Sequence, residues 1–379
     1  MRISLLFAFV LAMFTTPALS AADHTYWVFL GTGGNKTKGI YRVEFDSATG
    51  KLGKVELAAE AVNPGFLAIH PKNTHLFAVG GITNAEGKKV DGVMSFTLDA
   101  KTGELKPINQ QPSVGAGPCH INCDREGKHV LVANYGGGST TVLPFDKNGK
   151  LSEASCFVQH KGSSIDKGRQ SGPHAHSVNL DAAGKFAMVA DLGLDKVLVY
   201  KYDSATGKIE PNEPPAVDTP PGGGPRHFAF HPSGKFAYVC NEMASSVTAM
   251  TYDSSKGEFK TLNTVTTLPK EHKGNSTAET VVHPNGKFVY VSNRGHNSIA
   301  IFAIDEKSGE VKALGHQGEG VNVPRNFNID PTGKWMIVGN QQGNSIVVFE
   351  VDDKTGQLKT TDQKAEVPAP ICVRFVPKG

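Results

Sequence analysis

Charge of one sign and long apolar segments are both scarce in this sequence. Over 379 residues, 39 lysines and arginines nearly balance 36 aspartates and glutamates, which gives a formal net charge of +3. No run of basic residues occurs, so the composition argues against nucleic acid as a partner. After the first twenty or so residues no apolar segment approaches the length of a bilayer span, so no membrane span is expected. Any attraction for an anionic ligand must come from a local site.

Several motifs with a defined chemistry are also missing. The five cysteines form no Cys-x-x-Cys pair, so we expect free thiols rather than structural zinc, with one disulfide as the alternative. They are Cys119, Cys123, Cys156, Cys240 and Cys372. The sequence contains no Gly-x-Ser-x-Gly motif, so it gives no support to serine-hydrolase chemistry. The glycine-rich stretch 134–138 lacks the Lys-Ser/Thr pair of a phosphate-binding loop.

The N-terminus has the pattern of an export signal. Arg2 supplies a positive end, residues 3–14 are apolar, and residues 18–21 are small enough for cleavage. We therefore predict a signal peptide over residues 1–21 and a periplasmic or secreted mature protein. The alternative is a buried N-terminal strand.

Glycine is abundant, with 42 residues, and much of it belongs to a repeated pattern. An apolar strand is followed by His/Asp-Pro-x-Gly-Lys, a second apolar strand that ends in Asn, and a third strand. The clearest copies begin at Pro225, Glu279 and Pro324. The turn residue returns about every 52 positions, at His70, Asp124, Asp181, His231, His283 and Asp330. A repeat of this length with short alternating strands is typical of a four-stranded propeller blade.

The two ends of the chain bring the number of repeats to seven. Residues 25–52 have the later strands of a blade without its first strand, and residues 370–376 have a first strand with nothing after it. Pairing the two would close the ring and leave no long open sheet edge. We therefore predict an all-β fold, a single seven-bladed β-propeller over residues 22–379, closed by its N- and C-terminal strands in one blade.

The repeat separates architectural residues from candidate site residues. His70, His231 and His283 alternate with Asp before the turn proline, so we expect them to cap that turn. The Asn that ends the second strand also recurs and is expected to be architectural. A reactive residue that occurs in only some blades indicates a site.

Strand direction places such residues together. The first strands begin, and the second strands end, on the face opposite the Pro-x-Gly turns, which we call the mouth. The candidates there are three arginines, two glutamates and three histidines: Arg226, Arg294, Arg325, Glu242, Glu279, His120, His176 and His227. Arginine forks suit carboxylate or phosphate, and a channel mouth concentrates their field. We interpret the set as a pocket for a small anionic ligand; the alternative is a solvated rim of ordinary ion pairs.

Two further features are less specific. His174 and His176 lie on one face of an extended strand, but no third ligand follows at a suitable spacing, so no metal is expected. Residues 161–173 lengthen the repeat and form either a functional loop or a surface linker. The sequence does not indicate an oligomeric state.

Five short motifs together resemble the seven-bladed lactonase family. They are Arg169-Gln170-x-x-Pro173-His-Ala-His176, Gly224-Pro-Arg226-His227, Asn241-Glu242, Asn293-Arg294 and Pro324-Arg325. The family includes propeller-type 6-phosphogluconolactonases and carboxy-cis,cis-muconate cyclases. The resemblance implies four catalytic residues, His176, Arg226, Glu242 and Arg294. As substrate-binding neighbours we expect His120, Arg169, His174, His227, Glu279 and Arg325. No cofactor is expected.

The expected activity is hydrolysis of a sugar or aldonic lactone at the mouth, with Glu242 or His176 as the base. The predicted signal peptide conflicts with 6-phosphogluconolactone as the substrate, because that phosphate ester is cytoplasmic. The resemblance therefore supports lactone hydrolysis more strongly than it supports a phosphorylated lactone. One alternative is a lactone-forming enzyme of the muconate cyclase type. Another is a non-catalytic exported binding propeller, since Tyr238-Val-Cys-Asn resembles Tyr-Val-Thr-Asn repeats. A quinone dehydrogenase is disfavoured because only Trp27 and Trp335 are tryptophans.

Overall fold

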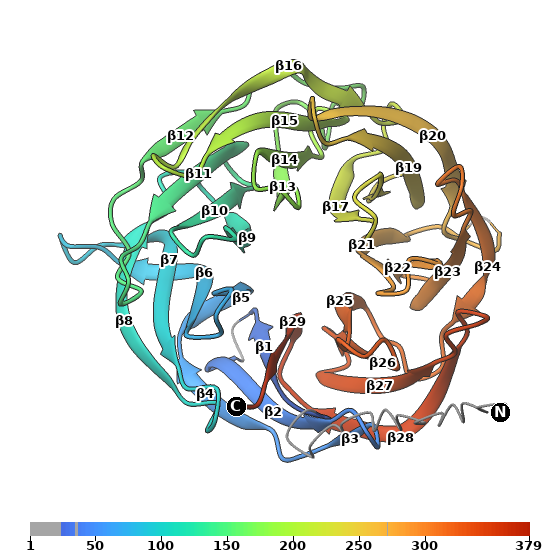
Figure 1. The fold of residues 1–379 in the computed structure, drawn as a ribbon, viewed down its shortest axis with the longest axis horizontal. Coiled ribbons are helices and arrows are strands. Elements are labelled where there is room, and N and C mark those ends of the chain that lie inside the picture. The colour runs from blue at the N-terminus through green and yellow to red at the C-terminus, as the bar shows by residue number, and fades with distance from the viewer. Residues whose placement is uncertain (1–23, 35–36, 271) are drawn as a thin grey trace, which may run out of the picture.

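The protein is a ring of seven β-sheets. A computed structural model describes residues 24–34, 37–270 and 272–379, and all 29 named elements in them are strands. Figure 1 shows the sheets arranged as blades around a central axis, with β1 and β29 side by side at the two ends of the colour scale. The predicted seven-bladed propeller is confirmed. The predicted signal peptide, residues 1–21, lies outside the described residues.

Each blade contains antiparallel strands numbered outward from the axis. Blade 1 holds β29 (Pro370–Pro377), β1 (Thr25–Thr32), β2 (Gly39–Asp46), β3 (Lys51–Leu52) and β4 (Glu56–Glu60). Blade 2 holds β5 (Val62–Ile69), β6 (His75–Thr83), β7 (Lys89–Leu98) and β8 (Leu105–Pro112). Blade 3 holds β9 (Pro118–Cys123), β10 (His129–Asn134), β11 (Ser139–Pro144) and β12 (Cys156–Gln159). Blade 4 holds β13 (Ala175–Leu180), β14 (Phe186–Asp191), β15 (Lys196–Asp203) and β16 (Lys208–Asp218). Blade 5 holds β17 (Pro225–Phe230), β18 (Phe236–Asn241), β19 (Ser246–Asp253) and β20 (Glu258–Thr266). Blade 6 holds β21 (Ser276–Val282), β22 (Phe288–Arg294), β23 (Ser298–Ile304) and β24 (Val311–Gln317). Blade 7 holds β25 (Pro324–Ile329), β26 (Trp335–Asn340), β27 (Ser345–Val351) and β28 (Leu358–Glu366).

The turn after each first strand is capped as the sequence predicts. In blade 5 the Nδ1 atom of His231 accepts a hydrogen bond from the backbone N–H of Ser233 at 3.0 Å. Gly234 follows with φ of +68°, a left-handed conformation that favours glycine. The other ring nitrogen of His231 lies 2.8 Å from the carbonyl oxygen of Gly286 in blade 6. The histidine therefore caps its own turn and also ties it to the next blade.

The asparagine at or next to the end of the second strand in blades 3, 5, 6 and 7 is architectural, as predicted. The amide nitrogen of Asn241 donates to the hydroxyl oxygens of Ser246 and Thr248, each at 2.9 Å. Asn134 makes equivalent bonds to Ser139 and Thr141. These bonds fix the turn from the second to the third strand at the mouth.

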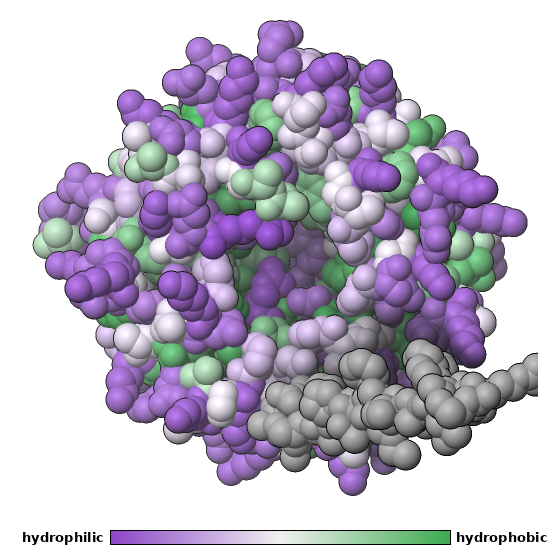
Figure 2. All heavy atoms as spheres, viewed as in Figure 1, coloured by the Kyte–Doolittle hydropathy of each residue, from purple (hydrophilic) through white to green (hydrophobic). Residues whose placement is uncertain are grey.

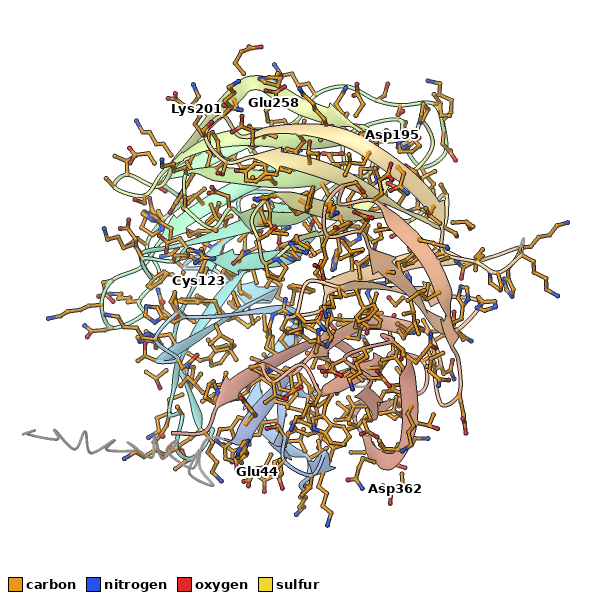
Figure 3. The ribbon with its side chains drawn as sticks, turned by 45° about the vertical axis from the view of Figure 1, so that its right-hand side comes forward. Glu44, Cys123, Asp195, Lys201, Glu258 and Asp362 are labelled. Atoms are coloured by element: carbon orange, nitrogen blue, oxygen red, sulfur yellow. The ribbon has the colours of Figure 1, made fainter. Side chains whose placement is uncertain are left out.

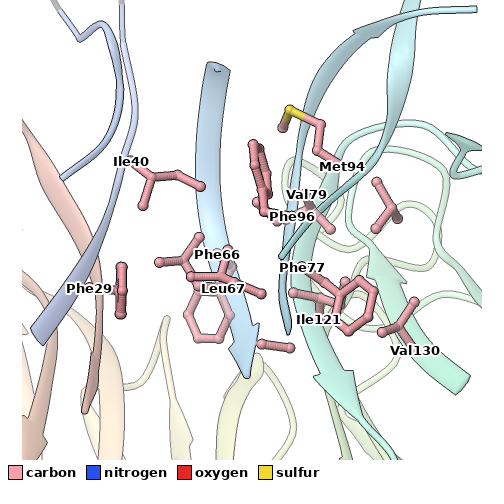
Figure 4. Close-up of a cluster of buried hydrophobic side chains, with 14 of the residues drawn as sticks. Phe29, Ile40, Phe66, Leu67, Phe77, Val79, Met94, Phe96, Ile121 and Val130 are labelled. Carbon is pink, nitrogen blue, oxygen red and sulfur yellow. The ribbon is translucent and has the colours of Figure 1, made fainter. Parts of the chain in front are cut away.

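Apolar side chains of neighbouring blades interlock and hold the ring together. Phe29, Phe66 and Phe77 belong to one buried cluster that joins blades 1, 2 and 3 (Figure 4). Between blades 5 and 6 the buried hydroxyl of Tyr238 donates to the carbonyl oxygen of Gly309 at 3.1 Å. All five cysteines are free thiols, as expected. No helix in the described ranges is long and apolar enough to cross a membrane.

The C-terminal strand closes the ring by pairing with β1. Val28 faces Phe375 and Leu30 faces Val373 in this antiparallel ladder, and Val373 is fully buried. Figure 2 shows that the surface is hollowed at the centre of the closed ring, with hydrophilic residues inside the hollow.

Deletion of residues 370–379 tests the closure. It removes the partner of β1 and exposes the apolar faces on both sides of the gap, so we expect loss of the single cooperative unfolding transition. The measurement is thermal unfolding followed by circular dichroism. Deletion of Gly379 alone is the control and should leave the transition in place. A cooperative transition at the wild-type temperature in the longer deletion would contradict the closure.

Candidate active site

A bulge in the first strands turns side chains into the channel at the mouth. In blade 5 the pairing of β17 with β18 shifts register between Pro225 and Phe228, and Arg226 lies in this shift. The same shift occurs at His176 in blade 4 and at Arg325 in blade 7. Bulges re-aim side chains in this way beside many active sites. Local backbone irregularity, repeated around the ring, therefore assembles the site.

Glu242, directly after β18, is the centre of the cluster. Its Oε2 atom accepts hydrogen bonds from Nε of Arg226 at 2.8 Å and lies 3.1 Å from a guanidinium nitrogen of Arg294. Its Oε1 atom accepts from Arg169 at 2.9 Å. The side chains of Arg226 and Glu242 are only 2% and 10% exposed. The structure thus brings three of the four predicted catalytic residues into direct contact.

The cluster has more positive than negative charge. Burial favours the neutral form of Glu242, but the charges of Arg226 and Arg294 and the hydrogen bond from Arg169 outweigh it and hold its pKa well below the ordinary value. Glu242 is therefore ionised at any physiological pH, and the arginines share this single carboxylate.

Arg325 has no such partner. Among the described residues it has no hydrogen-bond or ion-pair partner. Burial and the nearby Arg226 and Arg294 lower its pKa to about 9. A guanidinium remains charged at neutral pH, so this lowering shows how strongly the mouth favours a counter-anion.

His176 lies beside the carboxylate and is neutral. Its Nε2 atom is 3.9 Å from Oε2 of Glu242, and its Nδ1 atom is 3.7 Å from the thiol sulfur of Cys119. Burial, and then the charge of Arg226, lower its pKa well below 6.5. A neutral imidazole can accept a proton, and Glu242 is placed to stabilise the imidazolium that results.

The inserted segment 161–173 contacts the cluster around Glu242. This contact favours the interpretation as a functional loop over that as a surface linker. Arg169 extends from it to Glu242 and to the hydroxyl of Tyr135, 3.1 Å away, and its side chain is 46% exposed. The loop is anchored by Asp195, labelled in Figure 3, which accepts hydrogen bonds from Ser164 at 2.6 Å and Gln170 at 2.7 Å.

Tyr135 is the site residue that sequence reasoning missed. Its ring stacks on His174 with centroids 4.7 Å apart and meets His176 edge-on at 5.1 Å. The sequence placed it at the mouth, directly after a second strand, but its side chain carries no charge to distinguish it. His174 also bonds to the Tyr135 carbonyl at 2.9 Å. Nowhere in the described ranges do three or more His, Cys, Asp or Glu side chains come together to hold a metal ion.

His120, His227 and Glu279 lie one residue further along their first strands and form a second layer inside the channel. Nδ1 of His227 is 2.9 Å from Oε2 of Glu279, and burial raises the pKa of that carboxyl group. The rings of Phe66, His120 and His227 come from blades 2, 3 and 5 and meet with centroids 4.3 to 5.4 Å apart. We call these three rings the ring plug. This layer adjoins the mouth, since the ring of His227 meets that of His176 with centroids 5.4 Å apart, and its role in substrate binding stays a prediction.

Replacement of Glu242 tests the charge balance. Glu242→Gln removes the counter-charge of buried guanidinium groups, so we expect the free energy of unfolding at neutral pH to fall by about 3 kcal/mol. Because the folded pKa is depressed below the ordinary 4.5, this contribution is present above that pH and is lost as pH falls below it. Urea denaturation should show the difference from wild type shrinking on acidification. A difference independent of pH would contradict the assignment.

Comparison with known proteins agrees with this architecture. The family described as "Lactonase, 7-bladed beta-propeller" matches residues 27–375. A 6-phosphogluconolactonase of Bacillus subtilis is 35% identical over 353 residues, covering 92% of this chain and 98% of the relative. A second, from Formosa agariphila, is 35% identical over 310 residues, covering 80% and 86%.

A solved structure gives the same result at the level of the fold. The periplasmic gluconolactonase of Pseudomonas aeruginosa superimposes with a TM-score of 0.87 at 31% identity, covering 94% of this chain and all of that one. The match of the family over nearly the whole propeller, together with these relatives, shows that this chain belongs to the seven-bladed β-propeller lactonase family.

Proposed function

We propose that this protein hydrolyses a sugar or aldonic lactone at the mouth of the propeller, outside the cytoplasm. The observation that carries the proposal is the surplus of guanidinium groups around Glu242, with Arg325 forming no hydrogen bond or ion pair within the described part of the chain. Opening of a lactone develops negative charge on the carbonyl oxygen and ends in a carboxylate. Guanidinium groups held in place beforehand stabilise both.

The relatives narrow the substrate class. Two are named for a phosphorylated gluconolactone and one, periplasmic, for gluconolactone itself. All three names specify a sugar lactone, and the periplasmic one agrees with the export signal predicted over residues 1–21. We therefore propose a lactone of the gluconolactone type and a periplasmic or secreted location for the domain 22–379.

The geometry favours His176 over Glu242 as the base. The carboxylate oxygens of Glu242 already accept hydrogen bonds from arginines, and its low pKa makes it a weak base. His176 is neutral, so it can take a proton from the attacking water. In the second half of the reaction the ring C–O bond breaks, and the same proton passes from His176 to the leaving oxygen. Glu242 stabilises the imidazolium, while Arg226 and Arg294 act on the developing oxyanion.

The non-catalytic alternative has less support from the site. A binding surface built by the repeat would place similar residues in every blade, whereas His176, Arg226, Arg294 and Arg325 occupy four of seven blades and are not repeated in the others. The tyrosines of the Tyr-Val motifs are accounted for by their bonds between blades.

Substitutions at the mouth test the proposal. We expect Arg226→Ala and Glu242→Gln each to lower kcat for gluconolactone about 100- to 1,000-fold, since each removes charge aimed at the transition state. The measurement is proton release at constant pH, corrected for spontaneous hydrolysis, with and without a chelator. Arg125→Ala, on an exposed turn, is the control and should retain wild-type activity. Activity of the Arg226→Ala and Glu242→Gln proteins within a few-fold of wild type would contradict their assignment as catalytic residues.

The pH dependence tests the choice of base. His176 must be neutral to accept a proton, and its pKa lies well below 6.5. We therefore expect kcat/KM for uncharged gluconolactone to stay nearly constant as pH falls through 6.5 and to decline only in more acidic solution. A fall of kcat/KM on acidification with its midpoint near pH 6.5 would indicate a histidine of ordinary pKa. That result would contradict the lowered pKa of His176 as the base.

A further inference from the structure

The channel has a second hollow at its other end, on the face that carries the Pro-x-Gly turns. A cavity of about 410 Å³ lies there, among the ends of the first strands of blades 1, 2, 3, 4 and 7. Its polar lining includes Asn122, Asn179, Asn328 and Arg374, and Cys123, labelled in Figure 3, lies at its rim. These four polar residues occupy the same position of the repeat, three residues after the position that holds His176 and Arg325 at the mouth.

The lining contains one cation and no carboxylate. Arg374 lies over the ring of Phe66 at 4.7 Å and donates to the carbonyl oxygens of Leu67 and Val373 at 3.1 and 2.9 Å. No carboxylate among the described residues lies within ion-pair distance of it. The charge of Arg374 acts on Glu279 without forming an ion pair with it, so this partly buried guanidinium, hydrogen-bonded only to carbonyl oxygens among the described residues, favours an added anion.

The asparagines add unused hydrogen-bonding capacity. The side-chain oxygens of Asn122 and Asn179 accept no hydrogen bond from the described part of the chain, and their amide nitrogens make only long contacts of 3.5 Å. Asn328 uses its oxygen for its neighbour Ile329. An amide group donates and accepts at once, which suits hydroxyl groups. The cavity therefore combines one anion-binding group with two free amides.

The ring plug adjoins both this cavity and the mouth. His120 lines the cavity, His227 meets His176 with centroids 5.4 Å apart, and all three rings of the plug are buried. None of the residues that line the cavity bonds to Glu242.

We propose that this cavity is a second ligand site, which takes a small hydroxylated carboxylate of the sugar-acid class. The carboxylate would pair with Arg374, and hydroxyl groups would bond to Asn122 and Asn179. The inference rests on the lining residues and holds whether or not the mouth hydrolyses lactones. If the proposed function is correct, the ligand belongs to the same chemical class as the product.

Isothermal titration of the purified protein with D-gluconate tests the site, using variants that separate the two ends of the channel. Arg374→Met keeps a long side chain over the ring of Phe66 but removes the positive charge. We expect it to weaken gluconate binding at this site about tenfold or more. Asn179→Leu should do the same by filling the cavity, and it leaves Arg374 and its backbone bonds intact if the first variant fails to fold. Arg325→Ala at the mouth is the matched control and should leave this site within about twofold of wild type.

Two further probes test the ligand class. Acetate lacks the hydroxyl groups and glucose lacks the carboxylate, so each should bind at least about tenfold more weakly than gluconate. Because gluconate is also expected at the mouth, the cavity variants are compared in the Arg325→Ala background. Gluconate binding there that neither Arg374→Met nor Asn179→Leu weakens, or no gluconate binding in the Arg325→Ala protein itself, would overturn the site. Acetate binding as tightly as gluconate would overturn the sugar-acid class. None of these results depends on lactone turnover, so failure of this site and failure of the proposed function are distinguishable.

Discussion

The pairing of β29 with β1 is the constraint on which the rest of the structure depends. It joins residues from the two ends of the chain into one sheet and turns seven separate sheets into a closed ring. Once the ring is closed, the seven first strands face one another around a narrow channel. Side chains more than a hundred residues apart, such as His176 and Arg294, then meet within one cluster through Glu242.

Within that ring the mouth is a site of incomplete charge compensation. A buried carboxylate shared by several guanidinium groups is a costly arrangement, which hydrophobic residues of similar volume would often replace without loss of stability. The surrounding cations depress the pKa of Glu242, while burial, and then the charges of Arg226 and Arg294, lower the pKa of Arg325. In the proposed function, an anionic transition state or product would supply the missing negative charge.

The sequence predicted the ring and most of the mouth because both follow from the repeat. The spacing of turn residues gave the blades, the unmatched strands at the two termini gave the closure, and strand direction placed Arg226, Glu242 and Arg294 on one face. The bulge itself could not be predicted, because Arg226 and His227 together lie opposite one residue of β18 and the sequence pattern carries no sign of the extra residue. The contacts of Tyr135 and Arg374 could not be predicted, because their partners Arg169 and Leu67 lie in other segments of the chain.

The most direct test of the account is product inhibition at the mouth, measured as proton release from gluconolactone in the presence of gluconate. If the guanidinium cluster is the substrate site, the lactone ring should open well above its spontaneous rate, and gluconate should inhibit competitively, with weaker inhibition in Arg325→Ala. Opening at the spontaneous rate, or inhibition unchanged by loss of Arg325, would contradict the assignment of the guanidinium cluster as the substrate site.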